Sequence, residues 1–177
     1  METAFVTIIC VALMVIGGMT MSQGFLSSVD STTKNIRVLS QRDQEIMRTN
    51  ILIQSAHQTA PDRLMLKVKN IGQTKLAGFQ KWDVIVHSQD ASSQIFVTWL
   101  PYDSAGPGIN SWNIQGIYLD SEGLVPEVFE PGILNPDEEM VFLCILDPQV
   151  GPNTVNLVSV STPNGVTTSK TFFGYTP

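Results

Sequence analysis

Residues Thr3 to Val29 read TAFVTIICVALMVIGGMTMSQGFLSSV, and this stretch decides the fold because it contains no Asp, Glu, Lys or Arg. Its part from Ala4 to Met19 is an almost unbroken run of Val, Ile, Leu, Met and Phe. A helix needs about 17–25 mostly apolar residues to cross the hydrocarbon core of a bilayer. We therefore expect a helix that lies in lipid or packs against copies of itself.

The helix is predicted to continue beyond this apolar stretch. A stripe with alternating spacings of four and three, typical of one helix face, is formed by Phe25, Val29, Thr32, Ile36, Leu39, Asp43 and Ile46. No proline occurs before Pro61, so nothing ends the helix early. We predict a helix from about Glu2 to Arg48, on the order of 70 Å long at 1.5 Å per residue. After residue 30, packing on the chain's own globular domain is an alternative.

A cleaved secretory signal explains the apolar segment poorly. Such signals begin with basic residues, and the first basic residue here is Lys34. We expect instead that Met1 is the N-terminus left after a basic leader has been removed.

Beyond Thr49 the apolar residues recur with a period of two, which indicates strands. In the segment RLMLKVKN, for example, Leu64, Leu66 and Val68 alternate with Met65, Lys67 and Lys69. Proline, glycine and asparagine separate eight such segments, at residues 50–58, 63–70, 81–88, 94–100, 112–119, 140–146, 153–161 and 166–173. This spacing predicts an antiparallel sandwich of immunoglobulin-like architecture. The fold class is thus α+β, with a hydrophobic N-terminal helix at residues 1–49 and a sandwich domain at residues 50–177.

Charge and motifs exclude several classes of function. The net charge is −6, and the excess lies beyond residue 50, because the first 50 residues carry four acids and four bases. An acidic domain without a basic cluster argues against nucleic-acid binding. The chain contains no serine-hydrolase motif, phosphate loop or dinucleotide-binding motif, and we predict that it is not an enzyme. His57 and His87 are interpreted as ordinary strand residues.

Acidic residues are the remaining candidates for a site. The run Asp137-Glu138-Glu139 and the pair Asp120 and Glu122 carry the oxygen ligands that calcium prefers. Runs of this kind are usually solvated turns, so we predict no metal, no cofactor and no catalytic residue. Cys10 and Cys144 lie in different apolar segments and are expected to be buried free thiols.

The sequence resembles the archaellins, the type IV pilin-like subunits of archaeal swimming filaments. The resemblance rests on the uncharged N-terminal helix and on Gly24-Phe25-Leu26 within it. It also rests on Leu66-Lys-Val-Lys-Asn-Ile-Gly72, which is similar to the VKNxG strand and turn of that superfamily, and on Val160-Ser-Thr-Pro-Asn-Gly165, which is similar to its terminal hairpin. Phe5 stands where bacterial type IV pilins carry a glutamate, as an apolar residue does in archaellins, whereas Glu2 is unusual for either group. The resemblance implies that a prepilin-type peptidase removes a leader. It also implies that a membrane assembly platform then moves the helix from the cytoplasmic membrane into the core of an extracellular filament.

The expected function is therefore that of a structural subunit of a helical homopolymer, serving swimming motility. We predict that it polymerises through its helix, by an interface comprising Phe5, Val6, Ile8, Ile9, Val11, Leu13, Val15, Ile16, Gly17, Gly18, Phe25, Leu26, Val29, Ile36 and Leu39. Three alternatives remain. The first is an accessory, stator or minor pilin protein of the same machinery whose helix stays in the membrane, and the second is an adhesive pilus subunit. The third is a single-pass surface module that binds a ligand through its tryptophan-bearing strands or the loop Tyr102–Ser111.

Overall fold

The computed structural model describes residues 2–176 and divides the chain into two compact units, Met1–Gln44 and Glu45–Pro177. The first unit is a single helix, α1, which spans Glu2–Arg48 and whose last turn belongs to the second unit. Its bounds match the predicted ones. The helix is long because the segment contains no proline and because the glycines at 17, 18 and 24 are too few to end it.

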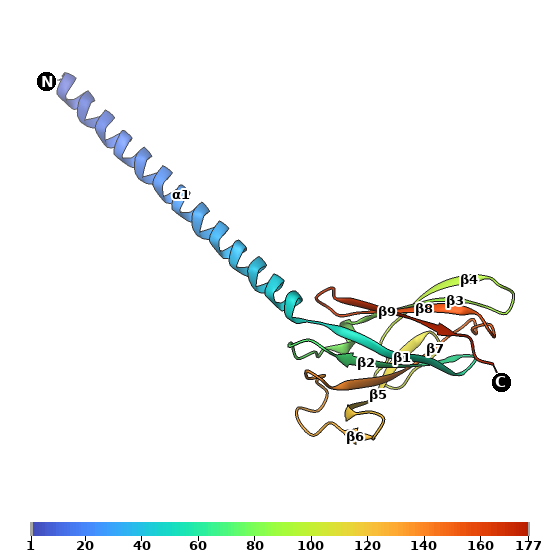
Figure 1. The fold of residues 1–177 in the computed structure, drawn as a ribbon. Coiled ribbons are helices and arrows are strands. Elements are labelled where there is room, and N and C mark those ends of the chain that lie inside the picture. Colours follow the sequence, from blue (N-terminus) through green and yellow to red (C-terminus); the bar gives the residue numbers. More distant parts are fainter. Residues whose placement is uncertain (1, 177) are drawn as a thin grey trace. The chain divides into compact units, whose positions relative to one another are not determined.

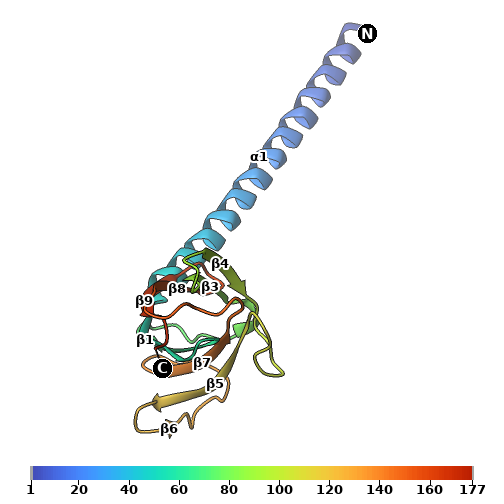
Figure 2. The ribbon, with the colours of Figure 1, turned by 90° about the vertical axis from the view of Figure 1, so that its right-hand side faces the viewer.

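The second unit is an antiparallel sandwich whose two sheets form separate layers (Figures 1 and 2). One sheet has the strand order β1-β2-β7-β5-β6, and the other has the order β4-β3-β8-β9. The strands are β1 (Ile51–Ala60), β2 (Arg63–Asn70), β3 (Asp83–Gln89), β4 (Ile95–Leu100), β5 (Ser111–Asp120), β6 (Val125–Pro126), β7 (Glu139–Ile145), β8 (Val155–Ser161) and β9 (Thr167–Phe173). The predicted fold class is confirmed, and each of the eight predicted segments contains a strand.

The core lies between the two sheets and follows from the alternation in the sequence. Leu64, Leu66 and Val68 of β2 are fully buried, as the pattern of that segment predicts. The largest side chains in this core are Trp82 and Trp112. They are therefore structural, and cannot form an exposed ligand platform together with Trp99, which is 56% exposed.

Two elements were not predicted from the sequence. A short 3₁₀ helix, η1, spans Phe79–Lys81 and delays the start of β3 to Asp83. β6 contains only Val125 and Pro126 and pairs irregularly with the end of β5. Both are too short to show a period in the sequence.

The turn after β2 requires a glycine because two backbone segments approach closely there. A Cβ atom on Gly72 would lie 2.4 Å from the Asn50 nitrogen and 2.6 Å from the Arg48 oxygen. The Ile71 N–H donates to the Asn50 oxygen, and the Gln73 N–H donates to the Arg48 oxygen. The glycine of the Lys-Asn-Ile-Gly motif therefore lets this turn pack against the end of α1 and the start of β1.

Candidate assembly interface

All fifteen residues of the predicted interface lie on α1. Within its own unit the helix has no neighbour, so in the single chain the thirteen large side chains among them are between 46% exposed (Ile9) and 69% exposed (Phe5 and Phe25). Interface residues between 5 and 18 surround the helix on every side, whereas Phe25, Val29, Ile36 and Leu39 follow one stripe, with Leu26 beside it. An apolar surface this large on a soluble protein marks a site of contact with lipid or with other proteins.

Length and composition also allow α1 to cross a membrane. Among the described residues it is the one helix that is both long enough and apolar enough, and its most apolar window of 18 residues has a mean hydropathy of 2.3. The ion pair on the helix comes after the uncharged segment Thr3–Val29, where Lys34 Nζ lies 2.7 Å from Asp30 Oδ2. Such exposed pairs, one helical turn apart, add only about 0.3–0.5 kcal/mol, so this pair marks the beginning of the water-compatible half rather than stabilising it strongly.

Four threonine hydroxyls on α1 donate hydrogen bonds to carbonyl oxygens one turn earlier in the helix. Thr7 donates to the Thr3 oxygen at 2.8 Å, and Thr20 donates to the Ile16 and Gly17 oxygens at 3.1 and 2.9 Å. Thr32 and Thr33 donate in the same way to Ser28 and Val29. A hydroxyl whose bond is already made loses little when it leaves water. These threonines can therefore enter lipid or a helix bundle at low cost.

The helix glycines are not required by the chain's own packing. A Cβ atom added at Gly17, Gly18 or Gly24 would meet nothing within 4 Å. Glycine inside a helix costs about 1 kcal/mol relative to alanine. Small residues allow the backbones of neighbouring helices to approach closely, which is what a bundle of identical helices needs.

The two cysteines differ in their surroundings. Both are free thiols, but Cys144 is fully buried in the sandwich, whereas Cys10 is exposed on α1 in the single chain. Burial raises the pKa of the Cys144 thiol well above its usual range, which makes this residue unreactive. The prediction that both thiols are buried is thus wrong for Cys10 in the single chain.

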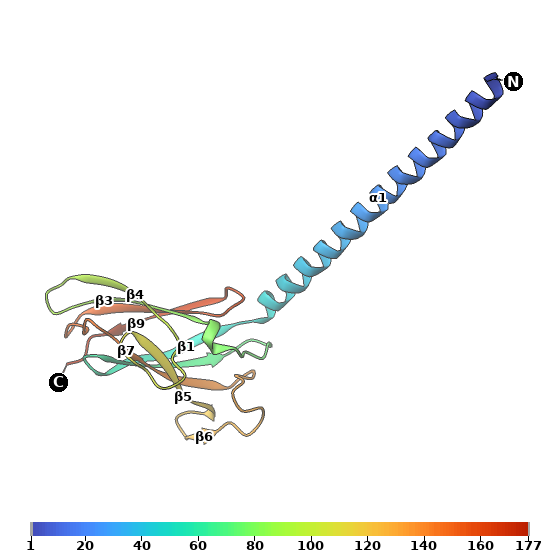
Figure 3. The same ribbon diagram turned by 180° about the vertical axis from the view of Figure 1, so that it is seen from behind.

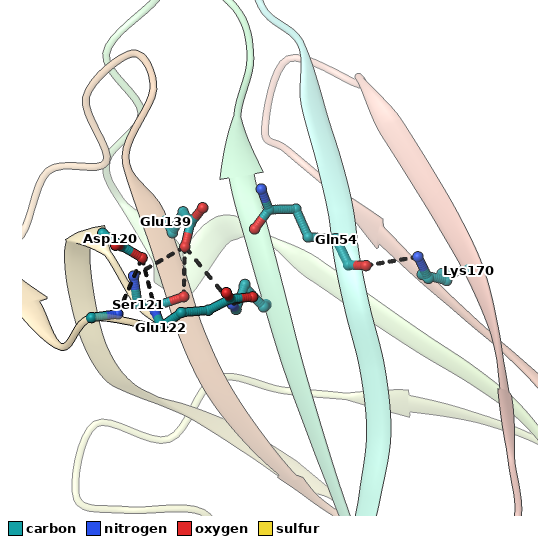
Figure 4. Close-up of polar contacts among 8 residues, drawn as sticks. Gln54, Asp120, Ser121, Glu122, Glu139 and Lys170 are labelled. Carbon is teal, nitrogen blue, oxygen red and sulfur yellow. Dashed lines mark hydrogen bonds and ion pairs between the residues drawn. The ribbon is translucent and has the colours of Figure 1, made fainter.

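Acidic residues gather beside a cleft of about 570 Å³ on the sandwich (Figure 4). Burial favours a raised pKa for Glu139, but hydrogen bonds from the Ser121 hydroxyl and N–H, together with Gln54 and Lys67, outweigh burial, so the pKa lies below its usual value. Lys67 Nζ, which lies 3.9 Å from Glu139 and 3.5 Å from Glu122, acts in the same direction on Glu139. Glu139 is therefore a charged structural residue that holds the β5–β6 turn.

The other acidic residues are also engaged in turns. Asp120 Oδ1 accepts from the N–H groups of Glu122 and Gly123, and Glu138 Oε2 accepts from the Asn135 N–H at 2.7 Å. Glu138 and Glu139 are only 3% and 9% exposed, so the interpretation of this run as a solvated turn is wrong for both. Over residues 2–176, no three His, Cys, Asp or Glu side chains are grouped so that they could hold a metal ion.

No protein-family model matches this chain, and no curated protein matches its sequence. Solved structures do match. The archaeal flagellum of Methanospirillum hungatei strain JF1 is 13% identical, with a TM-score of 0.59 over 93% of this chain and 88% of that one. The chain has the archaellin-like fold. Because the match leaves out only 7% of this chain, it has to include most of α1 as well as the sandwich.

Two further structures match the chain over a smaller part. The archaeal flagellin FlaB1 from Methanocaldococcus jannaschii is 8% identical, with a TM-score of 0.51 over 73% of this chain and 93% of that one. The archaellum periplasmic stator protein complex FlaF and FlaG from Sulfolobus acidocaldarius is 19% identical, with a TM-score of 0.51 over 69% and 87%. The resemblance to archaellins is confirmed at the level of the fold, which filament and stator proteins share.

Proposed function

We propose that this chain is a structural subunit of an archaellum-type surface filament and that it polymerises through α1. The observation that carries the proposal is the continuous exposed apolar surface of α1 on a chain with the archaellin-like fold. The fifteen predicted interface residues would form the filament core, residues 50–177 would form the outer domain, and the chain would have no enzymatic activity. Swimming motility is the function that this assembly would serve.

The energetics of the apolar segment support a transfer from membrane to filament. A helix that is apolar on every side is stable in lipid and also among identical helices, so moving between the two costs little hydrophobic free energy. Exposure to water is costly by comparison, since each buried large apolar side chain contributes about 1.5–3 kcal/mol. Before assembly the helix would lie in the cytoplasmic membrane, where a prepilin-type peptidase and an assembly platform would act on the chain.

Repeated contact between identical helices explains why the product would be a filament. A contact that joins two different surfaces of the same chain is heterologous, and its repetition gives an open helical polymer unless the rotation closes a ring. The stripe from Phe25 to Leu39 would extend this packing towards the outer domain. Close approach at Gly17 and Gly18 would favour the bundle over lipid.

A second candidate is an accessory protein of the same machinery whose helix stays in the membrane. The similarity to the stator complex of Sulfolobus acidocaldarius favours it, because that complex has the same type of sandwich. The two functions differ in where the chain is found. A filament subunit is abundant in filaments sheared from cells, whereas a membrane-anchored accessory protein remains with the membrane.

Cys10 provides the test. In sheared, lipid-free filaments we expect a water-soluble maleimide to leave Cys10 unlabelled, because sister helices cover the thiol that is exposed in the single chain. After dissociation in detergent and denaturation, mass spectrometry should find both Cys10 and Cys144 labelled. Rapid labelling of Cys10 in intact filaments contradicts the buried core, and absence of the chain from those filaments supports the accessory protein.

The proposed division between helix and sandwich gives another prediction. A fragment of residues 50–177 should fold into a soluble β protein that forms no filaments, because both sheets and their shared core lie within it. Circular dichroism would report its strands, and electron microscopy would report the absence of polymers. Filaments formed by this fragment alone would place the main contact in the sandwich instead of the helix.

A further inference from the structure

The two sheets of the sandwich have four outer strands, and three of them are protected. β1 and β9 lie beside each other, and Lys170 Nζ of β9 donates to the Gln54 oxygen at 2.7 Å, where β1 has a bulge (Figure 4). β6 is only two residues long and contains Pro126, which has no N–H to offer. Short strands, bulges and prolines are the usual means by which proteins prevent edge-to-edge pairing.

β4 is the fourth outer strand, and it lacks these protections (Figure 3). Its six residues pair only with β3 among the described strands. The segment from Ser92 to Leu100 contains no charged residue, no proline and no glycine, in a chain whose outer domain is acidic. The strand therefore presents a regular edge on which no charge opposes pairing.

The free edge is defined by alternation along the hairpin. The Asp90 N–H donates to the Gln94 oxygen at 3.0 Å, which makes these two residues a hydrogen-bonded pair of the β3–β4 hairpin. Since such pairs alternate along an antiparallel ladder, the backbone groups of Phe96, Thr98 and Leu100 bond to β3. The residues between them, Ile95, Val97 and Trp99, turn their N–H and C=O groups away from the sheet. Main-chain hydrogen-bonding groups are thus available at three consecutive alternate positions.

The same three residues carry the exposed apolar side chains of this strand. Ile95, Val97 and Trp99 are 73%, 63% and 56% exposed. Trp99 Nε1 donates to Asp83 Oδ1 at 2.9 Å, which satisfies the polar atom of the indole and leaves its ring apolar. A partner strand added at this edge would satisfy the backbone groups and cover the side chains together.

We propose that β4 pairs antiparallel with β4 of a second copy of this chain, which joins the two four-stranded sheets into one. A second copy is the partner because β4 is uncharged and therefore meets itself without repulsion, and because no other described strand of the copy offers a free edge. The contact is isologous, with a two-fold axis between the strands. It places Val97 opposite Val97 of the copy, and Ile95 opposite Trp99. This contact lies in the sandwich and is separate from the helix-mediated assembly proposed above.

The register can be tested with the full chain in detergent micelles, in a Cys10→Ala background. Opposite residues of an antiparallel pair have Cα atoms about 5.5 Å apart, within the range of a disulfide. We expect Val97→Cys to form a disulfide-linked dimer on mild oxidation. Ile95→Cys should cross-link when mixed with Trp99→Cys but not with itself, because two copies of residue 95 would lie about 13 Å apart.

Ser169→Cys is the matched control, since this exposed residue lies on the outer face of β9 in the same sheet. It should form no disulfide-linked dimer under conditions that cross-link Val97→Cys, although β4 can still pair. A separate variant, Val97→Lys, places two like charges opposite each other and should abolish the dimer in sedimentation experiments. Equal cross-linking at positions 97 and 169, or a dimer that survives Val97→Lys, would overturn the proposal.

Discussion

Replacing Ile9 with aspartate is expected to abolish filament formation while the sandwich stays folded. Ile9 lies in the middle of the uncharged segment, 46% exposed in the single chain and available for contact with sister helices. A carboxylate buried among apolar helices without a partner costs several kcal/mol, and every subunit of the polymer would carry this cost. Negative-stain electron microscopy of cell preparations would count the filaments, and circular dichroism of the purified chain would report the sandwich.

Ser40→Asp is the matched control for this variant. It adds the same charge to the same helix, but in the half that already contains Lys34, Arg37 and Arg42. We expect filaments from Ser40→Asp and none from Ile9→Asp or Val15→Asp. Normal filaments from both Ile9→Asp and Val15→Asp would contradict the hypothesis of a packed helical core.

The helix could be predicted to its ends because its signals are local. A helix is indicated by the absence of charge over Thr3–Val29, by the stripe from Phe25 to Ile46 and by the lack of any proline before Pro61. The three glycines within this stretch are too few to end the helix. The strands were predicted for a similar reason, since half-buried strands repeat every second residue.

The missed elements depend on contacts that are distant in the sequence. β6 exists because Val125 and Pro126 lie against Asp120 and Tyr118. Proline donates no backbone hydrogen bond, so a segment that contains it gives no strand signal of its own. The burial of Glu138 and Glu139 likewise depends on neighbours such as Ser121, which a linear pattern does not reveal.

The assembly interface was predicted from the apolar composition of the first segment, from the stripe that follows it and from the resemblance to archaellins. Every apolar side chain from Phe5 to Leu39 is exposed in the described unit, as it must be when the partners are other molecules. The free edge of β4 was not evident from the sequence, because it depends on which strands become outer strands. Strand order is set by packing, whereas the alternation in β4 is compatible with any position in a sheet.

Asn70 holds two segments of the sandwich together, whereas the sequence indicated only that it lies in a turn. Its side chain is fully buried, and Nδ2 donates to the Thr74 oxygen at 2.8 Å and to the Leu134 oxygen at 3.0 Å. Its Oδ1 accepts from the Gly72 N–H at 3.0 Å. This one amide thus joins the turn after β2 to the segment that precedes β7, and it uses each of its polar atoms.

Asn70→Asp is expected to lower the free energy of unfolding of the sandwich by about 3–5 kcal/mol, as for an unpaired buried charge. The substitution keeps the shape and the acceptor for Gly72, but it leaves the Leu134 and Thr74 oxygens facing a carboxylate in place of an N–H donor. Denaturation of the chain in detergent, followed by tryptophan fluorescence, would measure the loss, because Trp82 and Trp112 are buried in the core. Asn50→Asp, the same change at an exposed asparagine, is the control and should leave the unfolding midpoint within experimental error. Equal midpoints for the two variants would show that the buried amide does not hold the turn, and that the contacts of Gly72 alone are sufficient.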